Sequence, residues 1–99
     1  MGNQPYIVGV GAANLDLNGA SCAPIHLRYS NPGHISLSAG GVTRNVCENL
    51  ARLGADVKLL SCVGDDVFGS YIRRSCVEAG IDIRYLHEAK GARSSIFLS

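Results

Sequence analysis

Two helical segments, each stopped by a glycine and followed at once by an apolar run, constrain the fold of this chain most. The first lies between Gly41 and Gly54, and the second begins near Asp65 and ends at Gly80. Glycine commonly ends a helix because it adopts the left-handed conformation that closes the last turn. Helices that alternate with buried strands in this way predict an α/β fold on a parallel sheet with right-handed crossovers.

The hydrophobic periodicity gives the expected elements. Short apolar runs predict core strands at residues 6–11, 56–64 and 81–89, and a further strand at 94–99. Helical spacing predicts one buried face on each helix, formed by Val46, Cys47, Leu50 and Leu53 in the first helix and by Phe68, Ile72, Cys76 and Ala79 in the second. We expect Asp65 and Asp66 to cap the second helix.

The segment between the first strand and the first helix has a different character. Residues 17–38 are patchily polar and contain the turn sequences Asn18-Gly19 and Asn31-Pro32-Gly33. Two short alternating pieces, 25–29 and 34–38, predict exposed strands joined by turns.

Composition restricts the partners that the chain could have. It has 99 residues, enough for one domain, with 46% hydrophobic residues, 17% charged residues and a net charge of +1. Its basic residues are scattered, so neither a nucleic-acid polymer nor a membrane surface is an expected partner. The four cysteines form no CxxC pair, which argues against a zinc or other metal site. Cys47, Cys62 and Cys76 lie in apolar patterns and fit buried thiols, and with no leader sequence in view we expect a cytoplasmic protein.

Asn14 and Asp16 follow the first strand, at the edge of the sheet where open α/β folds bind ligands. An amide and a carboxylate two residues apart can donate to and accept from neighbouring hydroxyls, as sugar binding requires. An Asx turn that merely leaves the strand is the alternative interpretation. Asn14 also occupies the place of the third glycine of a dinucleotide-binding fingerprint, which excludes that class.

A second group of candidate ligand-binding residues surrounds the start of the first helix. Gly40 and Gly41 would let a ligand approach the helix N-terminus, and Asn45 lies one turn further on. Arg44 could donate to an anion or a carbonyl, although a helix arginine is usually solvated. The alternative is a glycine-rich turn with Asn45 capping the helix or exposed to water.

These residues match a known pattern. The stretch "GGVTRNVCENLARLGADVKLLSCVG" resembles the N-terminal motif of ribokinase-like (PfkB-type) carbohydrate kinases, with matching residues at Gly40, Gly41, Asn45, Gly54 and Gly64. "VGDDVFG" and "GAANLDL" are similar to further segments of that family, whereas Thr43 and Cys47 depart from its pattern. Within the family, "SNPGHISLSAGGVTRN" is most similar to pseudouridine kinases.

The resemblance implies the N-terminal portion of a three-layer α/β/α fold with a small β-sheet lid. Residues 1–99 would then form the N-terminal fragment of one kinase domain, with core segments 5–16 and 40–90 and lid segments 17–38 and 94–99. It also implies that the lid pairs two subunits into a homodimer.

The implied activity is ATP-dependent phosphorylation of the primary hydroxyl of a nucleoside, with pseudouridine as the expected substrate. The bound hydroxyls would contact Asn14, Asp16, Gly40, Gly41, Arg44 and Asn45. The catalytic base, the anion hole and most of the site for ATP and Mg²⁺ would lie beyond Ser99, so the 99-residue chain alone should be inactive. The alternatives are a kinase for ribose or another sugar or nucleoside, and a non-catalytic nucleoside-binding module.

Overall fold

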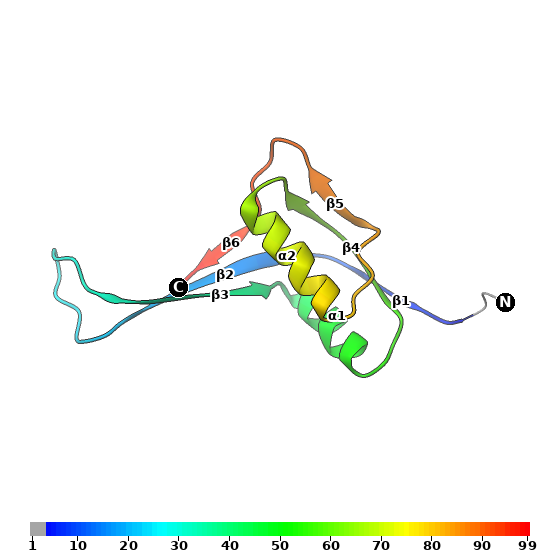
Figure 1. Ribbon diagram of the computed structural model, residues 1–99, viewed down its shortest axis with the longest axis horizontal. Coiled ribbons are helices and arrows are strands. Elements are labelled where there is room, and N and C mark those ends of the chain that lie inside the picture. Colours follow the sequence, from blue (N-terminus) through cyan, green and yellow to red (C-terminus); the bar gives the residue numbers. More distant parts are fainter. Residues whose placement is uncertain (1–3) are drawn as a thin grey trace.

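The computed structural model describes residues 4–99, so residues 1–3 of the expected domain lie outside the described residues. Two three-stranded sheets and two helices make up the described chain (Figure 1). In chain order the elements are β1 (Ile7–Val10), β2 (Asn14–Ser21), β3 (Gly33–Gly40), α1 (Val42–Arg52), β4 (Val57–Gly64), α2 (Val67–Glu78), β5 (Leu86–Ala89) and β6 (Ile96–Leu98). The prediction of an α/β fold is confirmed.

The core sheet has the order β1-β4-β5, and all of its strands are parallel. Along β4, Val57, Leu59 and Val63 are buried, because alternate residues of a strand face the same side and this side packs on α1 and α2. On the opposite side Val8 and Leu60 stay exposed. Within residues 4–99 the helices therefore form one layer against one face of the sheet.

The buried face of α1 differs in part from the prediction. Val46 is 51% exposed and Leu53 is 84% exposed, contrary to the prediction. Cys47 is buried and Leu50 packs against the core as predicted, and Arg44 is buried with them. Two stripes at helical spacing compete on this helix, and the stripe that starts at Arg44 turns inward. The expected face of α2 is confirmed, since Ile72, Cys76 and Ala79 are buried and Phe68 packs against the core.

One of the two aspartates that were expected to cap α2 does so. Asp66 alone caps α2, accepting a 2.7 Å hydrogen bond from the Gly69 N–H, while Asp65 accepts from the Gly91 N–H instead.

Cys47 and Cys76 are buried as expected, and burial raises the pKa of both thiols. Cys62 is exposed, contrary to expectation, because it falls on the face of β4 that the helices do not cover.

The second sheet has the order β3-β2-β6 and contains the segments that the resemblance assigns to the lid, so we call it the lid sheet. β2 and β3 make a long antiparallel hairpin that projects away from the helices (Figure 1), and β6 runs parallel to β2. β2 begins at Asn14 and β3 ends at Gly40. The lid sheet thus includes residues 14–16, the end of the expected core segment 5–16, and Gly40, the start of the expected core segment 40–90.

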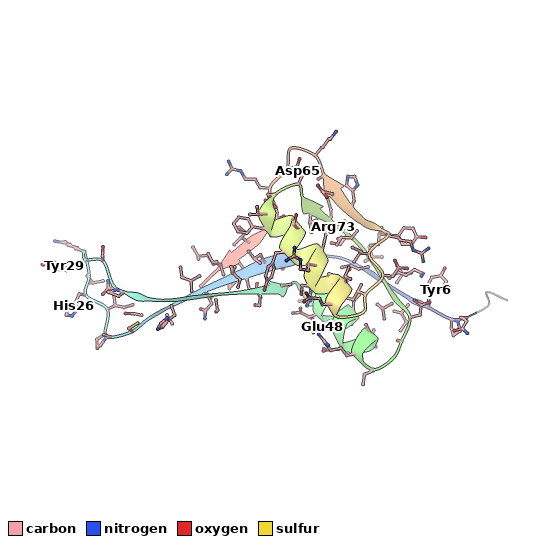
Figure 2. The ribbon with its side chains drawn as sticks, viewed as in Figure 1. Tyr6, His26, Tyr29, Glu48, Asp65 and Arg73 are labelled. Atoms are coloured by element: carbon pink, nitrogen blue, oxygen red, sulfur yellow. The ribbon has the colours of Figure 1, made fainter. Side chains whose placement is uncertain are left out.

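The predicted strand at 25–29 is wrong, because these residues form the irregular tip of the hairpin. The Asn31 side chain folds the tip: its Oδ1 accepts from the His26 N–H at 2.9 Å, and its Nδ2 donates to the His26 and Tyr29 carbonyls. Figure 2 shows His26 and Tyr29 at the far end of the hairpin. Side-chain bonds of this kind compete with strand pairing.

The predicted strand at 81–89 is too long. Only Leu86–Ala89 pairs continuously with β4, and one isolated bridge joins Lys58 to Asp82. The Asp82 carboxylate accepts from the backbone and side chain of Arg84, and this local turn interrupts the strand. Neither helix among residues 4–99 has the length and apolar content needed to cross a membrane.

Candidate functional site

Asn14 and Asp16 lie where the chain leaves the core sheet and enters the lid. β1 ends at Val10, and β2 starts at Asn14. Residues two apart in a strand share a face, and here Asn14 Nδ2 donates a 2.9 Å hydrogen bond to Asp16 Oδ1. Both residues are partly exposed. The bond fixes the two side chains as one unit and leaves Asp16 Oδ2 with further acceptor capacity.

Gly40 and Gly41 form the floor beneath this pair. The register of the hairpin sets Asn14 opposite Gly40. A Cβ added at Gly40 would collide with the Asp16 carboxylate, and one added at Gly41 would lie 2.5 Å from the Ala12 carbonyl oxygen and 3.0 Å from Asn14 Oδ1. Gly41 also has φ +98°, a conformation that residues with a side chain rarely adopt. Both positions therefore require glycine for Asn14 and Asp16 to lie as they do.

The first turn of α1 starts at this floor. Gly41 precedes the helix and supplies no side-chain cap, and the Arg44 N–H donates to the Ala12 carbonyl at 3.3 Å. Thr43, which departs from the expected pattern, packs beside the backbone of Gly9 and Gly11 in the β1 segment. The positive end of the helix dipole consequently lies next to Gly41, and a partial positive charge there favours ligand oxygens.

Arg44, a candidate ligand-binding residue with a solvated side chain as the alternative, is instead buried between the two helices. It is 3% exposed, and its guanidinium donates to Ser75 Oγ on α2 at 2.7 Å and to Asn45 Oδ1 at 3.1 Å. It also forms a 2.6 Å ion pair with Glu48. Hydrogen bonds from Arg52 first, and then from Arg44, lower the pKa of Glu48. Arg44 thus joins α1 to α2, and only its Nε lacks a hydrogen-bond partner among the buried side-chain atoms of residues 4–99.

Asn45 occupies the next position of α1 and is exposed. It does not cap the helix, because no side-chain cap is present at Gly41. Its Oδ1 accepts from Arg44, so its Nδ2 is left as a donor. A shallow cavity of about 340 Å³ borders Asn45 and is lined by Ala39, Arg44, Asn45, Glu48 and Asn49.

The six candidate residues therefore occupy three places in the structure. Asn14, Asp16, Gly40 and Gly41 lie against one another at the base of the lid. Asn45 follows one turn into α1, and its bond to Arg44 holds one side of its amide. Arg44 lies behind them, between the helices.

A set of hydrogen bonds that the sequence did not predict joins Ser94, two residues before β6, to Asp66 at the start of α2. Ser94 is buried, and its hydroxyl donates to Asp66 Oδ1 at 2.6 Å while its N–H donates to Asp66 Oδ2 at 2.8 Å. The Gly64 N–H in turn donates to Ser94 Oγ at 3.0 Å. Hydrogen bonds from Ser94 are the main cause of a lowered pKa at Asp66. Asp66 was predicted only as a helix cap. Nothing in the sequence near Ser94 indicated that it would bond to Asp66, which lies 28 residues away.

Comparison with known proteins places the chain in a family. The model of the pfkB family carbohydrate kinases matches residues 4–99. The chain belongs to the pfkB family. Its fold matches a predicted sugar kinase from Clostridium perfringens with a TM-score of 0.89 at 32% identity, covering 97% of this chain and 30% of that one. It also matches the ATP-bound fructokinase from Xylella fastidiosa with a TM-score of 0.81 at 26% identity, covering 94% and 28%.

Curated pfkB-type relatives include kinases for sugars and for nucleosides. The chain is 40% identical over 96 residues to the uncharacterized sugar kinase YeiI of Escherichia coli (strain K12), covering 97% of this chain and 26% of that protein. It is 36% identical over 99 residues to the pseudouridine kinase of the same organism, covering 100% of this chain and 32% of that protein. It thus spans about a quarter to a third of the length of these relatives. The pfkB family and the ribokinase-like α/β fold that the resemblance implied are confirmed.

Proposed function

We propose that this chain is the substrate-binding N-terminal part of an ATP-dependent kinase that phosphorylates the primary hydroxyl of a nucleoside. The observation that supports this most directly is the Asn14–Asp16 pair at the base of the lid. A 2.9 Å hydrogen bond joins the two side chains, and they lie on the floor formed by Gly40 and Gly41. A polar pair at the edge of an open α/β sheet is the usual position of a small-molecule site.

In the proposed complex Asp16 accepts hydrogen bonds from ribosyl hydroxyls. A carboxylate makes charge-assisted bonds, which are about twice as strong as neutral ones. Asn14 keeps the carboxylate in place through its own bond to Oδ1. The Asn45 amide, oriented by Arg44, offers a donor from the first turns of α1. Closure of the lid over the sugar would exclude water and so protect ATP from simple hydrolysis.

Pseudouridine is the substrate that we propose. The relative named pseudouridine kinase aligns with the whole chain at 36% identity, and a guanosine-inosine kinase of Exiguobacterium acetylicum is 43% identical over 63 residues. The fructokinase of Escherichia coli, at 34% identity over 76 residues, supports the second candidate, a kinase for ribose or another sugar. A nucleoside-binding module without catalysis is the third.

ATP would supply the phosphoryl group, and Mg²⁺ would neutralise charge on its phosphates. Among residues 4–99 no group of three or more His, Cys, Asp or Glu side chains is placed to hold a metal ion, so we assign no step through the metal to these residues. We further propose that the 99-residue chain transfers no phosphate unaided. Transfer of labelled phosphate from ATP to any nucleoside by the purified chain would contradict this.

We also propose that the protein forms a homodimer through the lid. One face of the lid sheet carries exposed apolar side chains, among them Ile35 at 74%, Leu37 at 45% and Leu98 at 72%. A second copy of the same face would remove this surface from water. Light scattering of the full-length protein tests this, and the variant Ile35→Asp should shift it towards the monomer. A wild-type monomer at micromolar concentration would contradict the proposal.

The decisive experiment for the activity is a substrate panel. The full-length protein is assayed with ATP and Mg²⁺ against pseudouridine, uridine, adenosine, inosine, ribose and fructose, with product mass as the readout. The proposal predicts the highest kcat/KM for pseudouridine, and phosphate on the 5′ oxygen. A higher value for ribose or fructose would favour the sugar kinase, and transfer to none of these compounds would favour the binding module.

A further inference from the structure

The lid sheet has two chemically different faces. Alternate residues of a strand point to opposite sides, and the register between strands therefore assigns every lid residue to a face. The first face is mostly apolar and includes Leu15, Leu17, Leu37, Ala39, Ile96 and Leu98. The second is mostly polar and includes Asn14, Asp16, Asn18, Ser36, Ser38 and Gly40.

Phe97 breaks this pattern. Its parallel pairing sets it beside Asp16, while its neighbours Ile96 and Leu98 pair with Leu15 and Leu17. Phe97 consequently lies on the polar face, and it is the single Phe, Tyr or Trp side chain on that face within β2, β3 and β6. It is 63% exposed. A large ring on this face therefore gains little from packing within residues 4–99.

The position of Phe97 relative to the polar pair matches the shape of a nucleoside. Neighbouring strands lie about 4.8 Å apart, so the backbone of Phe97 is one strand spacing from that of Asp16. A nucleoside has its ribosyl hydroxyls on one ring and a flat unsaturated base attached to it. Asp16 can accept from the hydroxyls while an aromatic ring one strand away meets the face of the base. Stacking is the contact that aromatic side chains make with bases, and it tolerates different bases because each has a π-face.

We propose that Phe97 stacks on the base and determines the preference for nucleosides over free sugars. This inference rests on the proposed function, since it takes Asn14 and Asp16 as the residues that hold the sugar. It adds a specificity residue from β6 to a site otherwise built from β2, β3 and α1. A free pentose offers hydroxyls to Asp16 and no base to Phe97, so its affinity should not depend on this ring.

The test compares two substrates and three variants of the full-length protein. Phe97→Ala should raise KM for pseudouridine about tenfold or more, the range expected for loss of one base stack. It should change KM for ribose less than twofold; if ribose is not phosphorylated, its inhibition constant replaces KM. Phe97→Tyr should restore the affinity for pseudouridine, because the stacking ring is kept. Leu98→Ala, next in the strand and on the opposite face, is the matched control and should leave the ratio of the two constants unchanged.

Two results would overturn the inference. Equal losses for pseudouridine and ribose in Phe97→Ala would mean that the ring contacts the sugar or maintains the lid, and no change for either would mean that it contacts neither. Failure of the proposed function gives a different result, because the wild-type protein would then phosphorylate no nucleoside. In that case calorimetric titration of pseudouridine into the wild type and Phe97→Ala decides about Phe97 alone: a tenfold weaker affinity supports stacking, and equal affinity or no binding overturns it.

Discussion

Replacing Asp16 by asparagine removes the charge from the proposed sugar site with little change in shape. Asp16 Oδ1 already accepts from Asn14, so the carboxylate has its second oxygen to offer to ribosyl hydroxyls. In Asp16→Asn one of the two side-chain positions becomes an N–H₂ donor, and the remaining oxygen is neutral. At least one charge-assisted hydrogen bond to the substrate is lost.

The expected size of this effect follows from the strength of such a bond. A hydrogen bond to a charged group contributes about 1.5–3 kcal/mol. Because about 1.4 kcal/mol corresponds to a factor of ten, kcat/KM for pseudouridine should fall about ten- to a hundredfold in the full-length enzyme. Steady-state kinetics with ATP in excess measures this, and thermal unfolding should change little, because Asp16 is partly exposed and Asn nearly has its shape.

Asn18→Ala is the matched control for this experiment. Asn18 lies on the same strand and the same face, is exposed, and lies two residues further from the floor of the site. Its replacement should leave kcat/KM within about twofold of the wild type. If Asp16→Asn keeps full activity, or loses it only through unfolding, Asp16 is a strand residue without a part in sugar binding, and the proposed site is refuted.

Three further variants of the full-length protein test other parts of the structure. Gly40→Ala should lower kcat/KM at least as much as Asp16→Asn, because the added methyl group displaces the Asp16 carboxylate; unchanged kinetics would show that the floor tolerates a side chain. Arg44→Met should lower the free energy of unfolding in urea by about 1.5–3 kcal/mol, because Glu48 and Ser75 lose a charged partner; an unchanged midpoint would contradict this. Asp66→Asn should lower the urea midpoint at pH 7. The pKa of Asp66 is lowered in the folded protein, so its stabilisation is present above its unfolded pKa of about 4 and is lost as the pH falls through the folded pKa. The urea midpoints of wild type and variant should therefore converge at acid pH. A difference that stays constant with pH would contradict the role of the Ser94 bonds.

The sequence predicted the parts of the fold that depend on local signals. Three features depend only on residues within or next to one helix: the glycines that end the helices, the cap at Asp66 and the apolar face of α2. The structure shows all three. The tip of the hairpin was mispredicted because the alternation of residues 25–29 resembles a strand, while the Asn31 side chain offers the backbone a competing set of bonds.

The remaining differences arise from contacts between distant residues. Arg44 was expected to contact the ligand or to lie in solvent, because nothing near it in the sequence indicates Ser75, its partner 31 residues away on α2. Its burial turns Val46 outward and so explains the error in the face of α1. Phe97 acquires its position only through the pairing of β6 with β2, which a residue pattern this short does not define. Asn14, Asp16, Gly40 and Gly41 were named as candidates from their places after the first strand and before the first helix, whereas the register that sets Asn14 opposite Gly40 has no local sequence signal.

A crystal structure of the full-length protein with pseudouridine tests the central claim most directly. We expect ribosyl hydroxyls within about 2.5–2.8 Å of the Asp16 carboxylate, the length of a charge-assisted O–H···O⁻ bond, with the sugar above Gly40 and Gly41. The base should then lie on the side of Phe97. Pseudouridine bound elsewhere, or bound with Asp16 facing water, would contradict the claim that the Asn14–Asp16 pair is the sugar-binding site.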